Sequence, residues 1–170
     1  SLFLLFDPEK KRWERSNKVY SRLGNLQPAV VELSPDHLLA FCRRGGDYEP
    51  GDDGFVVRTE SKDGGVTWSQ GEEPPFANPN AAVELIKLKS GNLLFVFNDS
   101  MDDRSPLTAA LSKDNGETFP IRVNLREGPE SFAYPTAIQT QDEMIHIFYS
   151  TNERTTICRI QFREESLTQQ

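Results

Sequence analysis

The sequence contains few of the residues that build disulfide or metal-held frameworks. Among its 170 residues are only 2 cysteines and 2 histidines. Cys42 and Cys158 lie in separate strand-like runs, which favours two buried thiols over a mutual disulfide. The sequence lacks the Cys/His spacing of zinc sites, the glycine-rich phosphate loop and the serine nucleophile elbow. We therefore expect no metal ion or organic cofactor.

An excess of positive charge and long apolar runs are also missing. The chain has 19 Lys and Arg against 26 Asp and Glu, so its net charge is −7 at neutral pH. This balance argues against nucleic acid or an anionic membrane as the main partner, because both bind basic surfaces. No apolar run approaches the length of a membrane span, and we expect no membrane segment. A local cluster of arginines could still hold an anionic ligand, and the cellular compartment stays open.

Helical periodicity is absent over any stretch of ten or more residues. Short apolar or alternating runs are instead separated by Gly, Pro, Asp and Asn, which is typical of an all-β protein. The runs 38–42 and 93–97 are apolar without alternation, which indicates strands that are covered on both faces. The sequence therefore predicts stacked antiparallel sheets.

One eight-residue motif occurs twice, as SKDGGVTW at 61–68 and as SKDNGETF at 112–119. The aspartate can accept hydrogen bonds from the backbone of a tight turn, and the glycine can adopt a conformation closed to other residues. The final aromatic residue can begin the next strand by packing on apolar neighbours. Two such turns about 50 residues apart predict a repeated sheet unit.

The shared pattern, S-x-D-x-G-x-T-[WF], resembles the Asp box of sialidases and their relatives, the bacterial neuraminidase repeat. The resemblance implies a six-bladed β-propeller of four-stranded antiparallel blades, in which the boxes are structural turns away from the active site. We therefore assign neither Asp63 nor Asp114 to catalysis.

On this reading the chain covers about three blades, the C-terminal half of the ring. Residues 1–23 would form the outer hairpin of one blade, 24–77 and 78–128 two full blades, and 129–170 an incomplete blade. Thirteen strands are expected, with the last strand of the first full blade beginning at Trp68. An open arc would expose apolar blade faces. We therefore expect a second copy or a missing N-terminal half to close the propeller.

Four residues are candidates for binding the substrate. Arg43 and Arg104 match two members of the arginine triad that the resemblance implies for a sugar carboxylate, and a guanidinium group suits that ligand. From spacing alone they would be interpreted as surface arginines in blade loops. Asn80 and Asp99 lie where loops should meet the central channel, and could bind sugar hydroxyls or simply form turns.

Three residues are candidates for catalysis. Tyr134, in the run FAYPTAI, matches the nucleophilic tyrosine of sialidases, although a tyrosine that packs at a strand start is the alternative. Gln27 stands where the resemblance implies a glutamate that takes the proton of the tyrosine, and an amide cannot accept that proton. Glu130 could substitute for it. The remaining arginine and the acid/base aspartate would belong to the N-terminal half.

The resemblance predicts a sialidase-like exo-glycosidase that hydrolyses terminal sialic-acid-type residues of acidic glycans without a cofactor. The alternative is a non-catalytic propeller that binds carbohydrate or protein, which the glutamine at position 27 favours. A third possibility is a different chemistry on uronic acid substrates.

Overall fold

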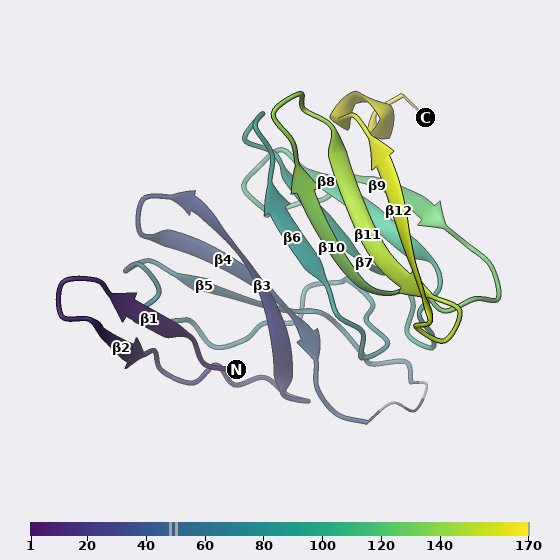
Figure 1. Ribbon diagram of the computed structural model, residues 1–170. Coiled ribbons are helices and arrows are strands. Elements are labelled where there is room, and N and C mark those ends of the chain that lie inside the picture. The colour runs from purple at the N-terminus through teal and green to yellow at the C-terminus, as the bar shows by residue number, and fades with distance from the viewer. Residues whose placement is uncertain (48, 50, 170) are drawn as a thin grey trace.

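The computed structural model describes residues 1–47, 49 and 51–169, and these residues form an all-β fold (Figure 1). Twelve strands and one short 3₁₀ helix, η1, are present in this part of the chain. They are β1 (Leu4–Asp7), β2 (Arg12–Arg15), β3 (Asn25–Ser34), β4 (His37–Arg44), β5 (Val57–Ser61), β6 (Glu84–Lys87), β7 (Leu93–Asn98), β8 (Leu107–Ser112), β9 (Ile121–Arg126), β10 (Ala133–Gln139), β11 (Ile145–Thr151), β12 (Thr156–Phe162) and η1 (Glu164–Leu167).

The strands form four antiparallel sheets in chain order. The hairpin β1-β2 is followed by the three-stranded sheet β3-β4-β5, the four-stranded sheet β6-β7-β8-β9 and the three-stranded sheet β10-β11-β12. Each strand pairs with the next one along the chain. The all-β fold class and the blade-like sheets predicted from the sequence are therefore confirmed.

The four-stranded sheet lies between its two neighbours and is buried on both faces. Along β7, Leu93, Phe95 and Phe97 belong to the core shared with β3-β4-β5. The alternate residues Leu94 and Val96 belong to the core shared with β10-β11-β12. Burying one such side chain stabilises the fold by roughly 1.5–3 kcal/mol. The uninterrupted apolar run of β7 thus serves two cores at once, as the sequence predicts.

The two repeated motifs fold into the same hydrogen-bonded turn. In the second turn Ser112 Oγ accepts a hydrogen bond from the Gly116 amide at 2.9 Å and donates one to Asp114 Oδ1 at 2.7 Å. The carboxylate of Asp114 accepts further hydrogen bonds from the amide and the hydroxyl of Thr118, at 2.9 and 2.5 Å. Asp63 of the first turn accepts the equivalent bonds from Thr67. Both carboxylates are therefore structural.

The hydrogen bonds of the second turn favour the charged form of its aspartate. Bonds from Thr118 first, and then from Ser112, lower the pKa of Asp114 from 3.8 to about 2. Because the folded chain binds this proton more weakly than the unfolded chain, the carboxylate stabilises the fold above about pH 4 and this contribution is lost as the pH falls toward 2.

The aromatic residue that ends each turn packs on the preceding sheet unit. Trp68 stacks on Phe3 beside the β1-β2 hairpin, with ring centroids 3.9 Å apart. Phe119 packs against Phe41 and Phe76 of the preceding unit, at 5.8 and 5.5 Å. Each turn therefore fastens its own sheet to the one before it.

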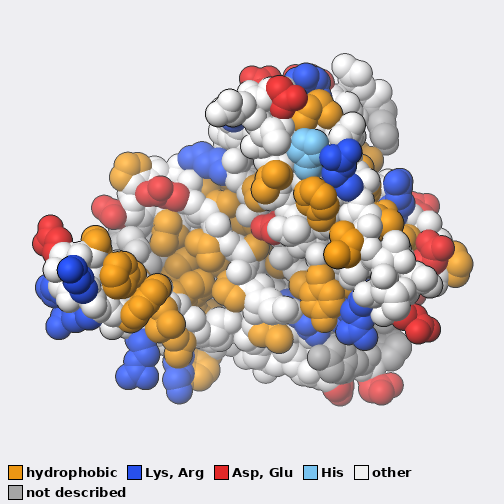
Figure 2. All heavy atoms as spheres, viewed as in Figure 1, with side chains coloured by type: hydrophobic (Ala, Val, Ile, Leu, Met, Phe, Trp, Pro, Cys, Tyr) orange, Lys and Arg blue, Asp and Glu red, His pale blue; other side chains and the backbone are white. Residues whose placement is uncertain are grey.

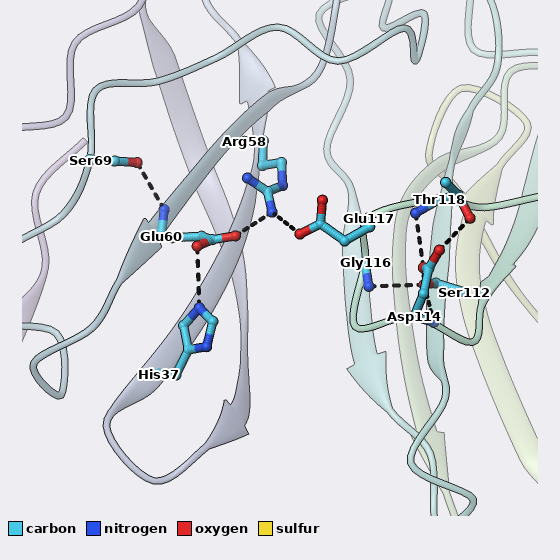
Figure 3. A network of polar contacts seen from close by, with 9 residues as sticks. All are labelled: His37, Arg58, Glu60, Ser69, Ser112, Asp114, Gly116, Glu117 and Thr118. Carbon is cyan, nitrogen blue, oxygen red and sulfur yellow. Dashed lines mark hydrogen bonds and ion pairs between the residues drawn. The ribbon is translucent and has the colours of Figure 1, made fainter.

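An ion-pair network joins the same two sheet units at their rim (Figure 3). Arg58 of β5 pairs with Glu60 on its own strand and with Glu117 of the second turn, the latter at 3.2 Å. Glu60 also contacts His37 Nε2 at 3.2 Å. The network adds polar contacts to the aromatic packing around the second turn.

The fourth strand predicted from Trp68 does not form a regular strand. Residues 69–77 follow β5, with backbone hydrogen bonds between Arg58 and Glu72 and from the Val56 amide to the Phe76 carbonyl. Only isolated bridges result, at Arg58–Glu72 and at Phe55–Ala77. Pro74 and Pro75 lie between these bridges, and proline has no amide hydrogen to donate. The strand predicted to begin at Trp68 is therefore replaced by an irregular edge, which leaves twelve strands where thirteen were expected.

Apolar side chains remain exposed at both ends of the row of sheets. On the N-terminal side Trp13 is 65% exposed, and Phe6 and Val30 are also exposed; Figure 2 shows hydrophobic side chains gathered over this region. On the C-terminal side Ile157 of β12 is 80% exposed. The outer sheets thus lack the cover that the central sheet has.

The buried serine of the second turn provides a test of this local structure. We expect Ser112→Ala to reduce the free energy of unfolding by about 1–3 kcal/mol, because the buried Gly116 amide loses its acceptor. Urea unfolding of the chain measures the change. Ser166→Ala, at an exposed serine in η1, is the matched control and should leave stability unchanged; equal effects of the two variants would contradict the assignment.

Candidate functional site

Strand register places the candidate residues at one end of the sheets and the repeated turns at the other. The first strands β3 and β10 both contact β6, and all three run in the same direction in Figure 1. Gln27, Asn80 and Tyr134 lie near the beginnings of these strands. Ser61 and Ser112 pair with Leu38 and Leu93, at the opposite ends of their sheets. The turns are thus remote from the candidate site, as the family resemblance implies.

Three of the candidates share an uncommon backbone conformation. The φ angles of Gln27, Asn80 and Tyr134 are 50°, 55° and 53°, in the left-handed region that few residues other than glycine adopt. The strand register shifts at Gln27 and at Tyr134, so these two residues occupy β-bulges. Bulges re-aim side chains and are common beside active sites. The first strands β3 and β10 therefore each present a redirected side chain at the same end of the fold.

Arg43 joins two of these positions from the end of β4. Its side chain is buried, with only 3% of its surface exposed. Its Nε donates a hydrogen bond to Asn80 Oδ1 at 2.6 Å, and its Nη1 donates one to Gln27 Oε1 at 2.8 Å. Asn80 in turn donates to the Asp47 carbonyl at 2.8 Å. The structure thus brings Arg43, Gln27 and Asn80 together.

The neighbouring Arg44 has a different role. Its Nε donates to the Asn78 carbonyl at 2.8 Å, and its Nη1 donates to the carbonyl of Gly45 at 3.0 Å. A further hydrogen bond runs from Nη1 to the Asp47 carbonyl at 3.2 Å. All three acceptors are backbone oxygens, so Arg44 secures loops. Arg43 is therefore the better candidate of the pair for contact with a ligand.

Arg104 and Tyr134 line one concave site. The cavity has a volume of about 600 Å³ and is lined by Arg104, Ser131, Tyr134, Glu153 and Arg154. The guanidinium carbon of Arg104 lies 5.4 Å from the ring centroid of Tyr134. Tyr134 is 40% exposed, so its phenol is accessible from this cavity. A loop residue, Arg104, and a residue of β10, Tyr134, thus meet at one site.

A buried asparagine holds the two walls of this cavity together. The Asn98 side-chain amide donates to the backbone carbonyls of Arg104 and Phe132, at 2.9 and 3.0 Å. The Phe132 amide also donates to the Arg104 carbonyl, at 2.9 Å. The backbone that carries Arg104 is therefore fixed beside the start of β10.

The positive charges around the phenol change its acidity. Interaction with Arg104 first, and with Arg154 second, lowers the pKa of Tyr134 below its ordinary value of 10.0. Cations favour the negatively charged phenolate over the neutral phenol. The cavity therefore stabilises the form of Tyr134 that is the stronger nucleophile.

Sequence reasoning missed three residues of this cavity: Ser131, Glu153 and Arg154. Glu153 and Arg154 belong to the turn between β11 and β12. The polar run TNERT between two alternating strands predicts a turn, but nothing in it indicates which end of the fold the turn reaches. Only the pairing of Ala133 with Ser150 brings that turn beside Tyr134.

Two other candidates lie elsewhere. Glu130 lines a neighbouring cavity of about 290 Å³, which shares Arg104 and Ser131 with the first cavity but is not lined by Tyr134. Asp99 accepts a hydrogen bond from Arg122 at 3.1 Å. These two carboxylates therefore stand beside the candidate site without lining the Tyr134 cavity.

Within the described residues, no cluster of three His, Cys, Asp or Glu side chains could hold a metal ion. Both cysteines are free thiols, as predicted, but only Cys42 is buried, whereas Cys158 is partly exposed. Burial raises the pKa of Cys42 to about 12. None of the described helices has the length and apolar character needed to cross a membrane.

Comparisons with known proteins agree with this architecture. A family model described as a BNR repeat-like domain matches residues 1–147. The sequence has no significant match among curated proteins.

Several solved structures contain the same fold. The NanB sialidase from Streptococcus pneumoniae superposes with a TM-score of 0.77 at 15% identity, over 96% of this chain and 27% of that one. The intramolecular trans-sialidase from Ruminococcus gnavus gives 0.75 at 14% identity, over 99% and 39%. The Hadza microbial sialidase Hz136 gives 0.72 at 20% identity, over 94% and 31%. The chain thus spans well under half of the length of these structures, and at such identities the likeness shows the fold alone.

The Asn80 contacts provide a test of how Arg43 is held. We expect Asn80→Gly to destabilise the chain by about 1–3 kcal/mol, because the Nε of buried Arg43 loses its acceptor. Asn80→Ala should cost roughly 1 kcal/mol more, since alanine also resists a positive φ. Chemical denaturation of the three proteins measures both differences. Wild-type stability in both variants would contradict the arrangement.

Proposed function

Because the chain belongs to the family of BNR repeat-like domains, within the superfamily that includes the sialidases, we propose that it is part of a sialidase-like exo-glycosidase. The substrate would be an acidic glycan with a terminal sialic-acid-type residue. The observation that carries this proposal is the shared cavity of Arg104 and Tyr134, which sets a guanidinium beside a phenol at the end where the first strands begin.

The proposed role of the arginines is to bind the carboxylate of the sugar. Arg104 has no carboxylate partner of its own among the described side chains, so its guanidinium is available to an anionic ligand. Arg43 would support the same end of the site from its position between Gln27 and Asn80. Charge-assisted bonds of this kind contribute roughly 1.5–3 kcal/mol each when shielded from water. Asn80 and Asp99 would contact sugar hydroxyls from the edge of the site.

The proposed role of Tyr134 is to attack the anomeric carbon. A phenol suits this position because it is neutral before it loses its proton, whereas a carboxylate nucleophile would be repelled by the sugar carboxylate as the substrate binds. Gln27 would orient Arg43, to which it is hydrogen-bonded. Glu130, in the neighbouring cavity, would reach the site only if the loop before β10 moved.

The second candidate function is non-catalytic binding of carbohydrate or protein. The engagement of Gln27 favours it, because its amide oxygen is occupied by Arg43 and cannot take a proton from Tyr134. In that case the arginines would still bind an acidic sugar, and Tyr134 would stack on it or donate a hydrogen bond.

Either function requires more protein than this chain. The sialidases that it resembles are more than twice as long, and apolar residues at both ends of the row of sheets remain exposed. We propose that a missing N-terminal half, or a second copy, covers these faces and closes the propeller. It would also supply the remaining arginine and the acid/base aspartate. The boundaries at residues 23, 77 and 128 would then separate successive blades.

Removal of the phenol hydroxyl separates the two functions. In the full-length protein we expect Tyr134→Phe to abolish turnover of a fluorogenic sialoside, because a benzyl ring has no oxygen nucleophile. Binding of an uncleaved sialic-acid analogue should survive, since the ring and both arginines remain. If the wild-type protein binds the analogue but never turns over the sialoside, the enzyme proposal fails and the binding module is supported.

Loss of the charge on Arg104 tests the carboxylate contact. We expect Arg104→Gln to weaken binding of an anionic sialic-acid analogue by about 10- to 100-fold, which corresponds to roughly 1.5–3 kcal/mol. Isothermal titration calorimetry on the full-length protein measures this. The control is Arg159→Gln, at an exposed residue of β12 that does not line the cavity; equal losses in the two variants would contradict a specific contact.

A further inference from the structure

Tyr134 has no carboxylate positioned as its base within the described site. Gln27, at the position implied for a base, is an amide whose oxygen accepts a hydrogen bond from Arg43. Glu130 lines only the neighbouring cavity. Among the described residues, Glu153 is the carboxylate that lines the Tyr134 cavity, and no hydrogen bond between these residues joins it to the phenol. Deprotonation of this phenol therefore needs help from groups other than a carboxylate base.

Two guanidinium groups line the same cavity as the phenol. Arg104 reaches it from the segment before β8, and Arg154 from the turn between β11 and β12. Other arginines of the described chain, such as Arg58 and Arg122, form ion pairs with nearby carboxylates. Neither Arg104 nor Arg154 has such a partner among the described residues. Both guanidinium groups thus line the cavity without an ion pair to a described carboxylate.

The backbone that carries Arg154 is held in an unfavourable conformation. Asn152, Glu153 and Arg154 have consecutive φ angles of 51°, 55° and 68°, and each such residue costs of order 1 kcal/mol. The Asn152 carbonyl accepts hydrogen bonds from the amide and the hydroxyl of Thr155, at 3.1 and 2.6 Å. Four-residue hairpin loops are most often built around a type I turn, whose central residues have negative φ. The left-handed run at 152–154 departs from that pattern in the turn that carries Arg154 to the cavity.

We propose that Arg154 is a positioning residue that acts with Arg104 to hold the deprotonated oxygen of Tyr134, so that two cations replace the missing carboxylate base. The phenol would give its proton to water, and the phenolate that remains would be stabilised by the two guanidinium groups. The attack of this phenolate on a sugar rests on the function proposed above. The stabilisation of the phenolate by the two arginines does not rest on it.

The charges that face the phenol agree with this role. They are Arg104 from the segment before β8 and Glu153 with Arg154 from the β11-β12 turn. The adjoining cavity, which Arg104 also lines, holds the carboxylates of Asp102, Asp103 and Glu130. The two cations lower the pKa of Tyr134, with Arg104 the larger influence and Arg154 the second. An opposite charge within a few ångströms favours the ionised form of a group. Arg154 therefore adds to the lowering of the Tyr134 pKa that Arg104 causes.

The proposal is tested by titrating the phenol directly. The chain has 4 tyrosines, so ¹³C-tyrosine NMR can follow each phenol, with Tyr134→Phe identifying the signal of interest. We expect Arg154→Gln to move the midpoint of Tyr134 to higher pH, and Arg154→Lys to restore most of the wild-type midpoint. Arg159→Gln, which removes an equal charge from the exposed face of β12, should leave it unchanged. An unchanged midpoint in Arg154→Gln would overturn the proposal.

A second measurement needs no substitution and decides the matter if Arg154→Gln does not fold. Added salt screens charges at an exposed site, so the Tyr134 midpoint of the wild-type chain should rise with ionic strength; a midpoint independent of salt would overturn the proposal. In the full-length protein, the rising limb of the pH profile of sialoside turnover should shift in the same direction in Arg154→Gln. A shifted phenol in a protein without turnover would support this inference and reject the enzymatic function.

Discussion

Burial of the central sheet on both faces is the constraint on which the rest of the structure depends. Because β7 alternates its side chains between two cores, neither neighbouring sheet can slide without opening apolar surface to water. Phe119 and the Arg58–Glu117 ion pair fasten the second turn to the preceding sheet unit. This packing keeps the three first strands side by side.

The polar end of the fold follows from that arrangement. A polar residue with a left-handed backbone lies close to the start of each of the three first strands: Gln27 in β3, Asn80 just before β6, and Tyr134 in β10. The arginines reach this end from other strands and loops, so no single segment of the sequence contains the site. A net charge of −7 coexists with this group of arginines. Part of the negative charge, at Glu60, Asp114 and Glu117, takes part in turns and ion pairs at the opposite end. A protein that is acidic overall can thus offer a local pocket for an anion.

Much of the fold could be predicted from the sequence because its signals are local. The turns at 61–68 and 112–119 carry their hydrogen-bonding groups within eight residues, and the apolar run of β7 reports burial on two faces. The irregular edge after Trp68 was missed, although Pro74 and Pro75 carried the signal for it. The site was less predictable. Arg43, Arg104 and Tyr134 could be proposed only through the family resemblance, and Arg154 could not be found, because its place depends on strand register across β10 and β11.

The central claim is that Arg43, Arg104 and Tyr134 gather around the acid group of one sugar in the completed propeller. The most direct measurement is a crystal structure of the full-length protein with an unsaturated sialic-acid analogue. The account predicts the sugar carboxylate within hydrogen-bonding distance of Arg43 and Arg104, with the Tyr134 oxygen facing the anomeric carbon. A carboxylate bound elsewhere, with these three side chains turned toward separate regions, would contradict it.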